Sequence, residues 1–569
     1  MSEKDLKKEI LELKAQIRKL KKNNLGLVFE DKSEDVVEQS KSKVPVFKEV
    51  VKNRLDLSEE YPNNLMIEGD NYLALSVLNY THKKNIDLIY IDPPYNTGAK
   101  DWKYNNDYVD SEDAYRHSKW LSFMRHRFNL AKELLKENGF IVCTIDHNEL
   151  FTLGVLMDKI FGEQNRIGVV TVVHNPKGRN FTKWFSANSE FMLIYAKDVN
   201  RASFSNVAID EDVSQSFDLV DNDGRRYRLE PFMRSRTETL RENKPNFWYP
   251  LYVSKDLNNI SLTKKKDYYE VYPITSNGKE ATWINLPETF SEKQNKNLFV
   301  AKNENGRIVI YRKYYEQQIY KNVWTDKKYQ SEFHGTNLLK EILGKKAFDY
   351  PKSIYAVLDV VRMMTNKNAV VLDYFAGSGT TGHAVLEANK IDGGSRKFIV
   401  CTNNENNNGS GTGGIAESVC YPRIKAIIKG YKNKKGEKVE GISSNLAYYQ
   451  TDLVDIEQIH KVPDEAKIRI TYQAGEMIAV REDTLNEVEK NEWWQIFEGN
   501  KKITAIYFKE DKAKLEDLID KLEKKNLPVA LYIFSWGKNE YKGEYSSQNI
   551  RVEDIPEPII EVYKELNRL

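Results

Sequence analysis

One short stretch combines an acid, two prolines and an aromatic ring directly after an apolar run. The run is 88–91, and Asp92, Pro93, Pro94 and Tyr95 follow it. An unbroken apolar run that stops at turn residues predicts a buried parallel strand. The prolines fix φ, so we expect a stiff turn that presents the acid and the ring at the strand's carboxyl end, where ligands of open α/β sheets bind. This pair suits a flat substrate with an amine, because the acid accepts from the amine and the ring stacks on its face; an ordinary strand-to-loop junction is the alternative.

A second segment whose residues could bind a ligand, Asp373 to Gly382, follows another apolar run and begins a helical pattern. It contains a G-x-G-x-x-G spacing, which is typical of dinucleotide sites but is a weak signal alone. Asp373 lies just before the glycines, where a pyrophosphate disfavours negative charge, and no acid lies about 20 residues beyond them. An acid beside a glycine turn favours a ligand with an ammonium and a sulfonium, such as the methionine end of S-adenosylmethionine. A glycine turn that serves packing alone is the alternative.

Strand-like runs alternate with helical patterns on both sides of a long interruption, and this alternation predicts a parallel α/β sheet. The helices expected to pack on it include 120–136 and 380–389. The strand-like runs are 65–70, 87–92, 139–146, 167–173 and 191–196, and then 369–375 and 397–402. We therefore expect one sheet that is interrupted by an insertion, with two of its strands arriving late in the chain.

These patterns divide the chain into five expected segments. The first begins with Leu6, Ile10, Leu13, Ile17 and Leu20 at coiled-coil spacing. Fewer than three heptads are marginal alone, and a helix packed on its own core is the alternative. The expected segments are 1–60 for an N-terminal helical arm and connector, 61–197 for the first half of the sheet domain, 198–345 for the insertion, 346–435 for the second half, and 436–569 for a small accessory α/β domain.

Composition excludes several classes of protein. No apolar run among the 569 residues reaches membrane-spanning length, and the three cysteines form neither a disulfide framework nor a zinc pattern. We therefore expect a soluble protein of the reducing cytoplasm, with no metal site and no membrane contact. The formal net charge of +2 neither favours nor excludes nucleic acid, so that argument depends on local patches.

The strongest local patch lies inside the insertion, at 224–244. It holds seven basic residues against three acids, with Tyr227 and Phe232 interleaved. Arginines can hold phosphates or read guanine edges, so we expect this patch to bind DNA; a solvated charged face is the alternative. The candidate DNA-binding residues are Arg225, Arg226, Arg228, Arg234 and Arg236.

With both motifs identified, the chain resembles DNA amino-methyltransferases of the subgroup whose catalytic motif precedes its cofactor motif. The paired D-P-P-Y and F-x-G-S-G-T-T, in that order, carry the resemblance. More narrowly, the chain resembles the modification (Mod) subunit of type III restriction–modification systems. The matching flanking stretches are the N-terminal heptads, 66–75, 118–135, 139–149, 184–197, 350–361, 401–406 and 421–425. The glycine-rich extension after Asn408 departs from the family pattern, and the C-terminal domain matches it only loosely.

The resemblance implies a Rossmann-like methyltransferase sheet in circularly permuted motif order, with an inserted target-recognition domain and a small C-terminal α/β domain. It implies S-adenosylmethionine as the cofactor, with Asp373, Phe375 and Gly377 around its methionine part. Asp70 would contact the cofactor's adenine, and Glu405 its ribose hydroxyls. The full set of implied cofactor-binding residues is Asp70, Lys352, Asp373, Phe375, Gly377, Gly379, Thr380 and Glu405.

The implied reaction is methyl transfer to N6 of an adenine that is rotated out of the DNA duplex. Asp92 and the Pro93 carbonyl would accept the amine hydrogens and localise the nitrogen lone pair, while Tyr95 stacks on the base. Pro94 completes the implied catalytic motif. Adenine is expected rather than cytosine because cytosine-N4 members of the family usually carry serine where Asp92 stands.

The resemblance also implies the partners, which are double-stranded DNA, a second copy of the chain in a homodimer, and a separate restriction (Res) subunit with helicase and nuclease activity. The Res subunit is expected as a separate chain because this sequence has no G-x-x-x-x-G-K-[ST] motif. The alternatives are a solitary methyltransferase for adenine or cytosine N4, an RNA methyltransferase, a non-catalytic DNA-binding specificity subunit, and a dinucleotide-dependent oxidoreductase.

Overall fold

The computed structural model divides the chain into two compact units, residues 206–320 and the remainder, 1–205 with 321–569. It describes residues 32–105, 107–178, 184–205, 217–221, 225–294, 296–315, 320–404, 414–459, 462–536 and 541–567. The N-terminal heptads and the candidate ribose ligand Glu405 lie outside these described residues. The smaller unit falls inside the insertion that the sequence pattern predicts at 198–345.

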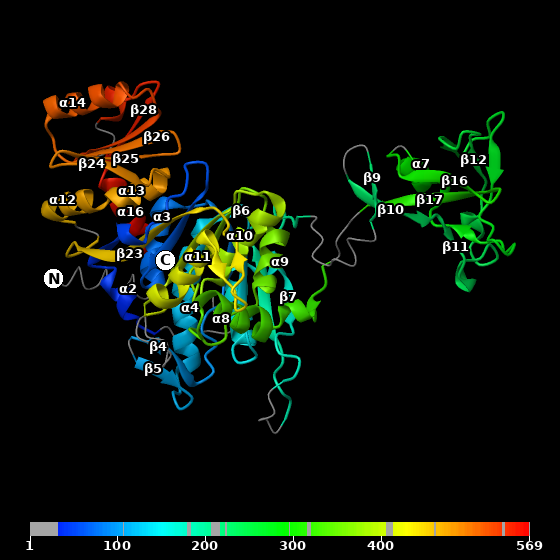
Figure 1. The fold of residues 1–569 in the computed structure, drawn as a ribbon, viewed down its shortest axis with the longest axis horizontal. Coiled ribbons are helices and arrows are strands. Elements are labelled where there is room, and N and C mark those ends of the chain that lie inside the picture. Colours follow the sequence, from blue (N-terminus) through cyan, green and yellow to red (C-terminus); the bar gives the residue numbers. More distant parts are fainter. Residues whose placement is uncertain are drawn as a thin grey trace, which may run out of the picture. The chain divides into compact units, whose positions relative to one another are not determined.

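A large sheet forms the centre of the larger unit (Figure 1). In the described residues it has ten strands, in the order β1-β23-β2-β20-β19-β3-β6-β8-β7-β18. Eight of these strands share one direction, and β1 and β8 run antiparallel to their neighbours. The strands are β1 Lys43–Glu49, β2 Asn63–Glu68, β3 Ile86–Ile91, β6 Leu135–Ile145, β7 Arg166–Val172, β8 Glu190–Ala196, β18 Val323–Trp324, β19 Val370–Asp373, β20 Lys397–Thr402 and β23 Asn445–Asp455.

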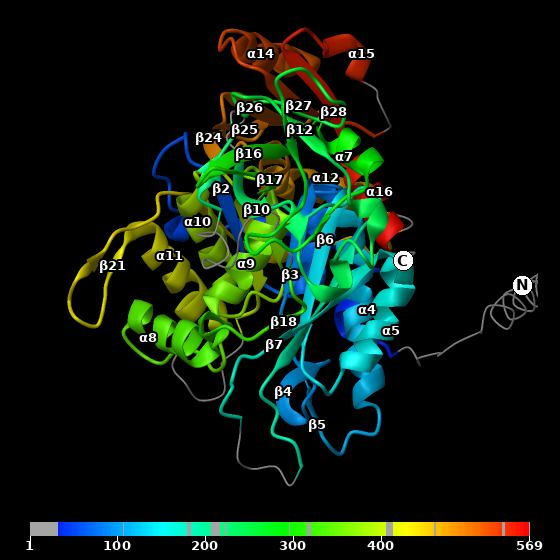
Figure 2. The same cartoon turned by 90° about the vertical axis from the view of Figure 1, so that its right-hand side faces the viewer.

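Helices cover both faces of this sheet (Figure 2). One layer contains α3, α4 and α5, and the opposite layer contains α8, α9, α10 and α11. Their bounds are α3 Asn71–Thr81, α4 Arg116–Leu134, α5 Leu150–Phe161, α8 Leu338–Leu343, α9 Ile354–Met364, α10 Thr380–Asp392 and α11 Tyr421–Lys429. The short helix α2 Asp35–Gln39 precedes β1, and the hairpin β4 Ala99–Tyr104 and β5 Asp107–Asp110 follows β3.

The chain direction switches between β19 and β3, which are neighbours in the sheet. Val371 pairs with Leu88 in parallel register, although about half of the chain separates β3 from β19. From β19 the chain continues through α10 to β20 on one side, whereas from β3 it continues through α4 to β6 on the other. Connections that diverge in this way leave a crevice at the carboxyl ends of the strands, where ligands of open α/β sheets bind. The predicted α/β fold with late-arriving strands is confirmed.

Three strands differ from the expected pattern. The run at 191–196 predicts a parallel strand, but β8 is antiparallel to both β6 and β7. β7 directly precedes β8 in the chain and neighbours it in the sheet, and such strands can pair antiparallel without a crossover helix. β1 lies inside the expected connector and β23 inside the expected accessory domain. They pair with each other, and β23 also pairs with β2, so both extend the main sheet.

The chain after β23 forms a second sheet within the same compact unit, in the order β24-β25-β26-β27-β28. β26, β27 and β28 are parallel, with α14 between the first two. α13 and α16 both contact α3 of the main domain. The bounds are α12 Asp464–Gln473, α13 Gly475–Glu482, β24 Asn486–Lys490, β25 Trp494–Gly499, β26 Lys502–Tyr507, α14 Lys512–Glu523, β27 Val529–Phe534, α15 Lys542–Tyr545, β28 Ile550–Ile555 and α16 Glu557–Leu566.

The smaller unit is rich in short strands. Its main sheet has the order β16-β17-β10-β9 in the described residues, and Phe232, Trp283 and Phe290 fill its core. The bounds are β9 Leu219–Val220, β10 Arg226–Pro231, β11 Met233–Arg234, β12 Leu251–Val253, β13 Ile260–Ser261, β14 Tyr269–Val271, β15 Thr282–Trp283, α7 Pro287–Gln294, β16 Phe299–Glu304 and β17 Arg307–Tyr315.

Two further features concern the described part of the chain as a whole. None of its helices combines the length and the apolar character that crossing a bilayer requires. Within the same part, no group of three or more His, Cys, Asp or Glu side chains is placed to hold a metal ion. The three cysteines, Cys143, Cys401 and Cys420, are buried and free.

Candidate functional site

A cavity of about 310 Å³ opens at the carboxyl ends of the central strands. Five loops supply its walls: those after β2, β3, β19 and β20, and the β4–β5 hairpin, together with a ring from α4. The lining residues are Gly69, Asp70, Asn71, Asp92, Pro93, Pro94, Trp102, Lys103, Phe123, Tyr374, Phe375, Gly377, Thr402, Asn403 and Ile415. The D-P-P-Y turn and the glycine turn therefore border one cavity, as their positions at the ends of adjacent parallel strands require.

Asp92 is held from two sides by groups that donate to its carboxylate. The Thr144 hydroxyl, at the end of β6, donates to Asp92 Oδ1 at 2.6 Å. The Lys352 ammonium lies 3.2 Å from the same oxygen. Because both contacts use Oδ1, they orient the carboxylate and leave Oδ2 as the acceptor for a substrate amine.

Lys352 also joins Tyr95 and Glu190 into one buried group. Its ammonium lies 2.5 Å from Glu190 Oε2, donates to the Tyr95 hydroxyl, and sits 4.7 Å from the centre of the Tyr95 ring. The Tyr95 hydroxyl in turn donates to Glu190 at 3.0 Å. Burial alone would lower the pKa of Lys352, but the carboxylates of Asp92 and Glu190 raise it to about 12. Although burial opposes it, Lys352 also keeps the pKa of Glu190 below its ordinary value, so the group contains a fixed ammonium between two carboxylates.

A second set of contacts fixes the backbone of the D-P-P-Y turn. Trp120 Nε1 on α4 donates to the Pro94 carbonyl at 2.7 Å. The next residue, Asn96, has a left-handed φ of 55° and donates to the buried carboxylate of Glu149 at 2.5 Å. His117 Nδ1 lies 2.5 Å from the same Glu149 oxygen. The turn is therefore rigid before any substrate binds, which is the condition for effective positioning.

Asp373 holds the glycine turn after β19 in place. It is not among the residues that line the cavity, so its position differs from the cofactor contact implied for it. Asp373 accepts from the Phe375 amide at 2.9 Å and from the Thr381 hydroxyl, and its side chain is buried. Burial raises the pKa of Asp373 to about 7. Gly377 has φ +47°, and a Cβ there would lie 3.1 Å from the Phe348 ring, so this position favours glycine.

Behind the glycine turn lies a fully buried arginine, Arg423 of α11. Its guanidinium donates to the hydroxyls of Thr380 at 2.8 Å and Ser378 at 3.1 Å. Burial lowers the pKa of Arg423 to about 10. Gly379, which precedes α10, packs closely here, because a Cβ on it would lie 3.1 Å from the Cys420 sulfur. Gly379 and Thr380 thus support the turn from behind and are not among the cavity-lining residues.

Asp70 lines the same cavity, at the start of α3. Its Oδ1 caps the helix by accepting from the Tyr72 amide at 2.7 Å. Arg127 of α4, which is fully buried, lies 3.5 Å from Asp70 and 2.8 Å from Glu34 Oε1. Its guanidinium also stacks 3.6 Å from the centre of the Phe123 ring. Arg127 therefore positions one cavity carboxylate and one cavity ring together.

The structure brings most of the predicted site residues together. Asp70, Asp92, Pro93, Pro94, Phe375 and Gly377 line the cavity. Lys352 lies against Asp92 and Tyr95 and is not among the lining residues, so its position differs from the cofactor contact implied for it. Asn403 lines the cavity two residues before Glu405, which is outside the described residues.

Sequence reasoning missed four residues of this site: Thr144, Glu190, Arg127 and Arg423. Arg127 offered a signal, because it lies beside Met124 and Phe128 on the apolar side of a helical pattern, where an unpaired charge would be costly. Thr144 and Glu190 flank ordinary apolar strands, and only the strand order shows that both face Asp92 and Tyr95.

The predicted DNA-binding arginines lie in the smaller unit, on or beside β10 and β11. Arg225 pairs with Asp221 at 2.8 Å, Arg228 pairs with Glu230 at 2.6 Å, and Arg226 donates to the Phe217 carbonyl at 3.0 Å. Arg234 and Arg236 are exposed. An aromatic ring also contacts these arginines: the Arg225 guanidinium lies 4.6 Å from the centre of the Tyr315 ring.

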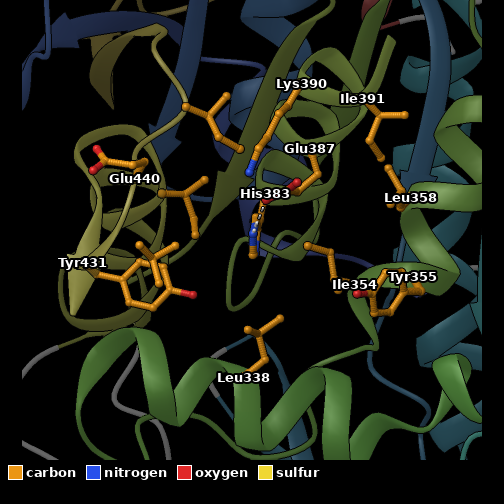
Figure 3. A pocket seen from close by; sticks show the side chains of 13 residues that line it. Leu338, Ile354, Tyr355, Leu358, His383, Glu387, Lys390, Ile391, Tyr431 and Glu440 are labelled. Atoms are coloured by element: carbon orange, nitrogen blue, oxygen red, sulfur yellow. Dashed lines mark ion pairs between the residues drawn. The ribbon is translucent and has the colours of Figure 1, made fainter. Parts of the chain in front are cut away.

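Another cavity, of about 280 Å³, lies behind α10 and shares no lining residue with the first (Figure 3). His383 and Glu387 of α10 point into it beside Lys390, opposite Leu338 and Tyr431. His383 Nε2 lies 3.7 Å from Glu387 Oε1, and burial lowers the pKa of His383 to about 4, so its ring is neutral. None of the predicted site residues borders this cavity.

Comparison with known proteins supplies the class to which this fold and site belong. The model of the DNA methylase family matches residues 86–407, which is more than half of the chain. A type II methyltransferase, M.KpnI of Klebsiella pneumoniae, is 35% identical over 59% of this chain and 79% of that protein. The chain belongs to the DNA methylase family.

Two Mod subunits of type III restriction–modification enzymes are also similar. The EcoPI subunit of Escherichia phage P1 is 32% identical over 60% of this chain, and the StyLTI subunit of Salmonella typhimurium is 31% identical over 60% of it. The matches cover 58% and 52% of those two proteins. The chain therefore spans little more than half the length of the Mod subunits it matches.

Proposed function

We propose that this chain is a site-specific DNA methyltransferase that moves a methyl group from S-adenosylmethionine to N6 of adenine. The observation that carries the proposal is the single cavity that joins the D-P-P-Y turn to the glycine turn. The D-P-P-Y turn supplies a fixed carboxylate that can accept from an amine, and the other side of the cavity has a glycine turn beside aromatic rings. Membership in the DNA methylase family supports the same reaction class.

The residues around the cavity fit S-adenosylmethionine. Asp70 and Asn71 offer polar groups, and Thr402 and Asn403 offer more from the adjacent loop, as an adenosine requires. The Phe123 and Phe375 rings, 5.8 Å apart, supply an apolar wall, and Gly377 adds a side-chain-free stretch of backbone to the same cavity. Bound there, S-adenosylmethionine would supply a methyl group that is activated by its sulfonium.

The chain's own part in the reaction is to hold and polarise the amine. Asp92 Oδ2 and the Pro93 carbonyl accept the two hydrogens of the adenine amine, which localises the lone pair on that nitrogen. Lys352 and Thr144 keep the carboxylate in place through Oδ1. The Lys352 ammonium donates to the Tyr95 hydroxyl, which fixes the ring that stacks on the rotated base. Correct orientation of reactants can recover about 7–11 kcal/mol of a barrier.

We further propose that residues 198–345 recognise the DNA sequence, with Arg225, Arg226, Arg228, Arg234 and Arg236 as contacts. Arg234 and Arg236 are the strongest candidates, because the other three side chains have acidic or carbonyl partners within the unit. The similarity to two Mod subunits supports a role in a type III system with a Res partner. A homodimer and a cytoplasmic location belong to the same proposal.

The test is methyl incorporation into DNA from labelled S-adenosylmethionine. The Asp92→Ala variant should lose transfer while it keeps DNA affinity, because the carboxylate acts on the amine and not on the phosphates. Tyr95→Ala should weaken capture of the target base more than binding of the cofactor. Full incorporation by Asp92→Ala would refute the catalytic role, and equal loss of both affinities in Tyr95→Ala would refute the stacking role.

A solitary type II methyltransferase is the second candidate function. The similarity to M.KpnI favours it, since that match covers a larger share of the relative than either Mod match does. The neighbouring reading frame discriminates the two: a helicase–nuclease gene beside this one supports the type III role, and its absence supports the solitary role.

A further inference from the structure

An aromatic pair protrudes from the loop between β7 and β8. Trp184 and Phe185 are 82% and 97% exposed, and these are the largest exposed fractions among the large hydrophobic side chains of the described residues. Exposing two adjacent large rings costs solubility and is uncommon without a binding role.

This loop arises at the edge of the sheet that carries the cavity. It leaves β7 and returns to β8 at Glu190, whose carboxylate accepts from the Tyr95 hydroxyl at 3.0 Å. Figures 1 and 2 both show the coloured arms of the loop beyond the strand ends, on the side where β4 and β5 lie. β4 follows the D-P-P-Y turn in the chain, so both views place the loop on the catalytic side.

The two arms of the loop are held against each other near its base. The Asn175 amide donates to the Asn188 carbonyl at 3.1 Å, and a Cβ on Gly178 would lie within 2.4 Å of the Ser186 hydroxyl. Phe185 is five residues from Glu190 in the chain, which is at most about 18 Å of extended backbone. The pair can therefore reach a duplex whose target base occupies the cavity.

The charge of the loop selects its partner. From residue 173 to residue 189 the sequence contains Lys177, Arg179 and Lys183 and no acid. An acid-free basic segment with exposed rings matches a polyanion with apolar interior faces, which is the chemistry of duplex DNA. A protein partner would need complementary acids, and it would not explain why the loop lies beside the site proposed for the target base.

We propose that Trp184 and Phe185 insert into the base stack beside the target adenine and occupy the space it leaves. This inference rests on the proposed function, because only an enzyme that rotates a base out of DNA creates that space. Unstacking and unpairing one nucleotide costs a few kcal/mol, and DNA-bending proteins offset such costs by inserting apolar side chains. The pair thus lowers the cost of base extrusion and takes no part in cofactor binding.

The experiment compares two duplexes that differ only opposite the target adenine. The methylated sequence is first mapped on DNA treated with the full-length protein, and two oligonucleotide duplexes then carry it, one with thymine and one with an abasic site facing the target. An unpaired base is cheaper to extrude, so the second duplex needs no wedge. Trp184→Ala/Phe185→Ala is assayed against wild type, with Trp536→Ala as the matched control, because this tryptophan is also exposed and follows β27.

The double variant should lose roughly 10- to 100-fold in kcat/KM on the paired duplex, the range of one or two lost stacking contacts. On the abasic duplex it should stay within about threefold of wild type, with unchanged S-adenosylmethionine affinity, and Trp536→Ala should match wild type on both. Equal losses on the two duplexes, or no loss on the paired one, would overturn the wedge while the proposed function stands. Failure of the wild type to methylate either duplex would overturn both.

Discussion

At the scale of single residues, the chemistry depends on how charge is arranged around Asp92. Lys352 lies between Asp92 and the buried Glu190, so one ammonium balances two carboxylates. The sequence could identify Asp92 and Tyr95 because an acid and a ring beside two prolines stand out in any sequence. It could not place Lys352 against Asp92 or find Glu190, since these contacts join residues that are far apart in the chain.

Lys352→Met should reduce both stability and activity. Removing one partner of a buried ion pair costs about 3–5 kcal/mol, because Glu190 is left without its counter-charge. The double variant Lys352→Met/Glu190→Gln removes that charge, so it should recover most of the stability but little of the methyl transfer. Denaturant unfolding and kcat measure the two effects, and parallel recovery of both in the double variant would show that Lys352 has only a structural role.

Asp373 should make stability depend on pH. Its pKa of about 7 lies above the value of about 3.9 in an unfolded chain. Between these two pKa values the folded state keeps a proton that the unfolded state has lost. The contribution of Asp373 to the free energy of unfolding is therefore complete below about pH 4, falls as the pH rises to about 7, and stays constant above that. The Asp373→Asn variant lacks this decline. From about pH 4 to pH 7 the free energy of unfolding of the wild type should therefore fall by up to about 4 kcal/mol relative to that of the variant. Unfolding curves from pH 4 to 8 measure this difference, and parallel pH profiles for the two proteins would contradict it.

At the scale of elements, the strands that carry the site were predictable and the sheet's edges were not. β3, β6, β19 and β20 each contain an apolar run, because helices cover both of their faces. The run that forms β8 is equally apolar, but nothing in it encodes its antiparallel direction. β1 contains Pro45 between lysines, and the second half of β23 is polar, so neither shows the pattern of a buried strand.

Arg127→Met tests how α4 supports the start of α3. Loss of the guanidinium leaves Glu34 and Asp70 uncompensated, so the free energy of unfolding should fall by about 3–5 kcal/mol and S-adenosylmethionine affinity should fall with it. Arg166→Met is the control, since it removes a more exposed arginine–carboxylate pair and should cost under about 1 kcal/mol. Calorimetry and cofactor titration measure the effects, and similar behaviour of the two variants would contradict a positioning role.

At the scale of the whole molecule, the chain builds one sheet domain from two separate stretches. Residues 206–320 interrupt it as a compact unit of their own, so the cavity combines residues that precede this unit with residues that follow it. The order of the two motifs allowed this arrangement to be predicted. The extent of the C-terminal part was harder to predict, because β23 belongs to the main sheet while the strands after it form another.

The most direct test of the account is the identity of the methylated nucleoside. DNA is incubated with the full-length protein and S-adenosylmethionine, digested, and analysed by mass spectrometry, with Asp92→Ala in parallel. We predict N6-methyladenine with the wild type and none with the variant. N4-methylcytosine as the product, or N6-methyladenine from the variant, would contradict the assignment of Asp92 and the cavity it borders.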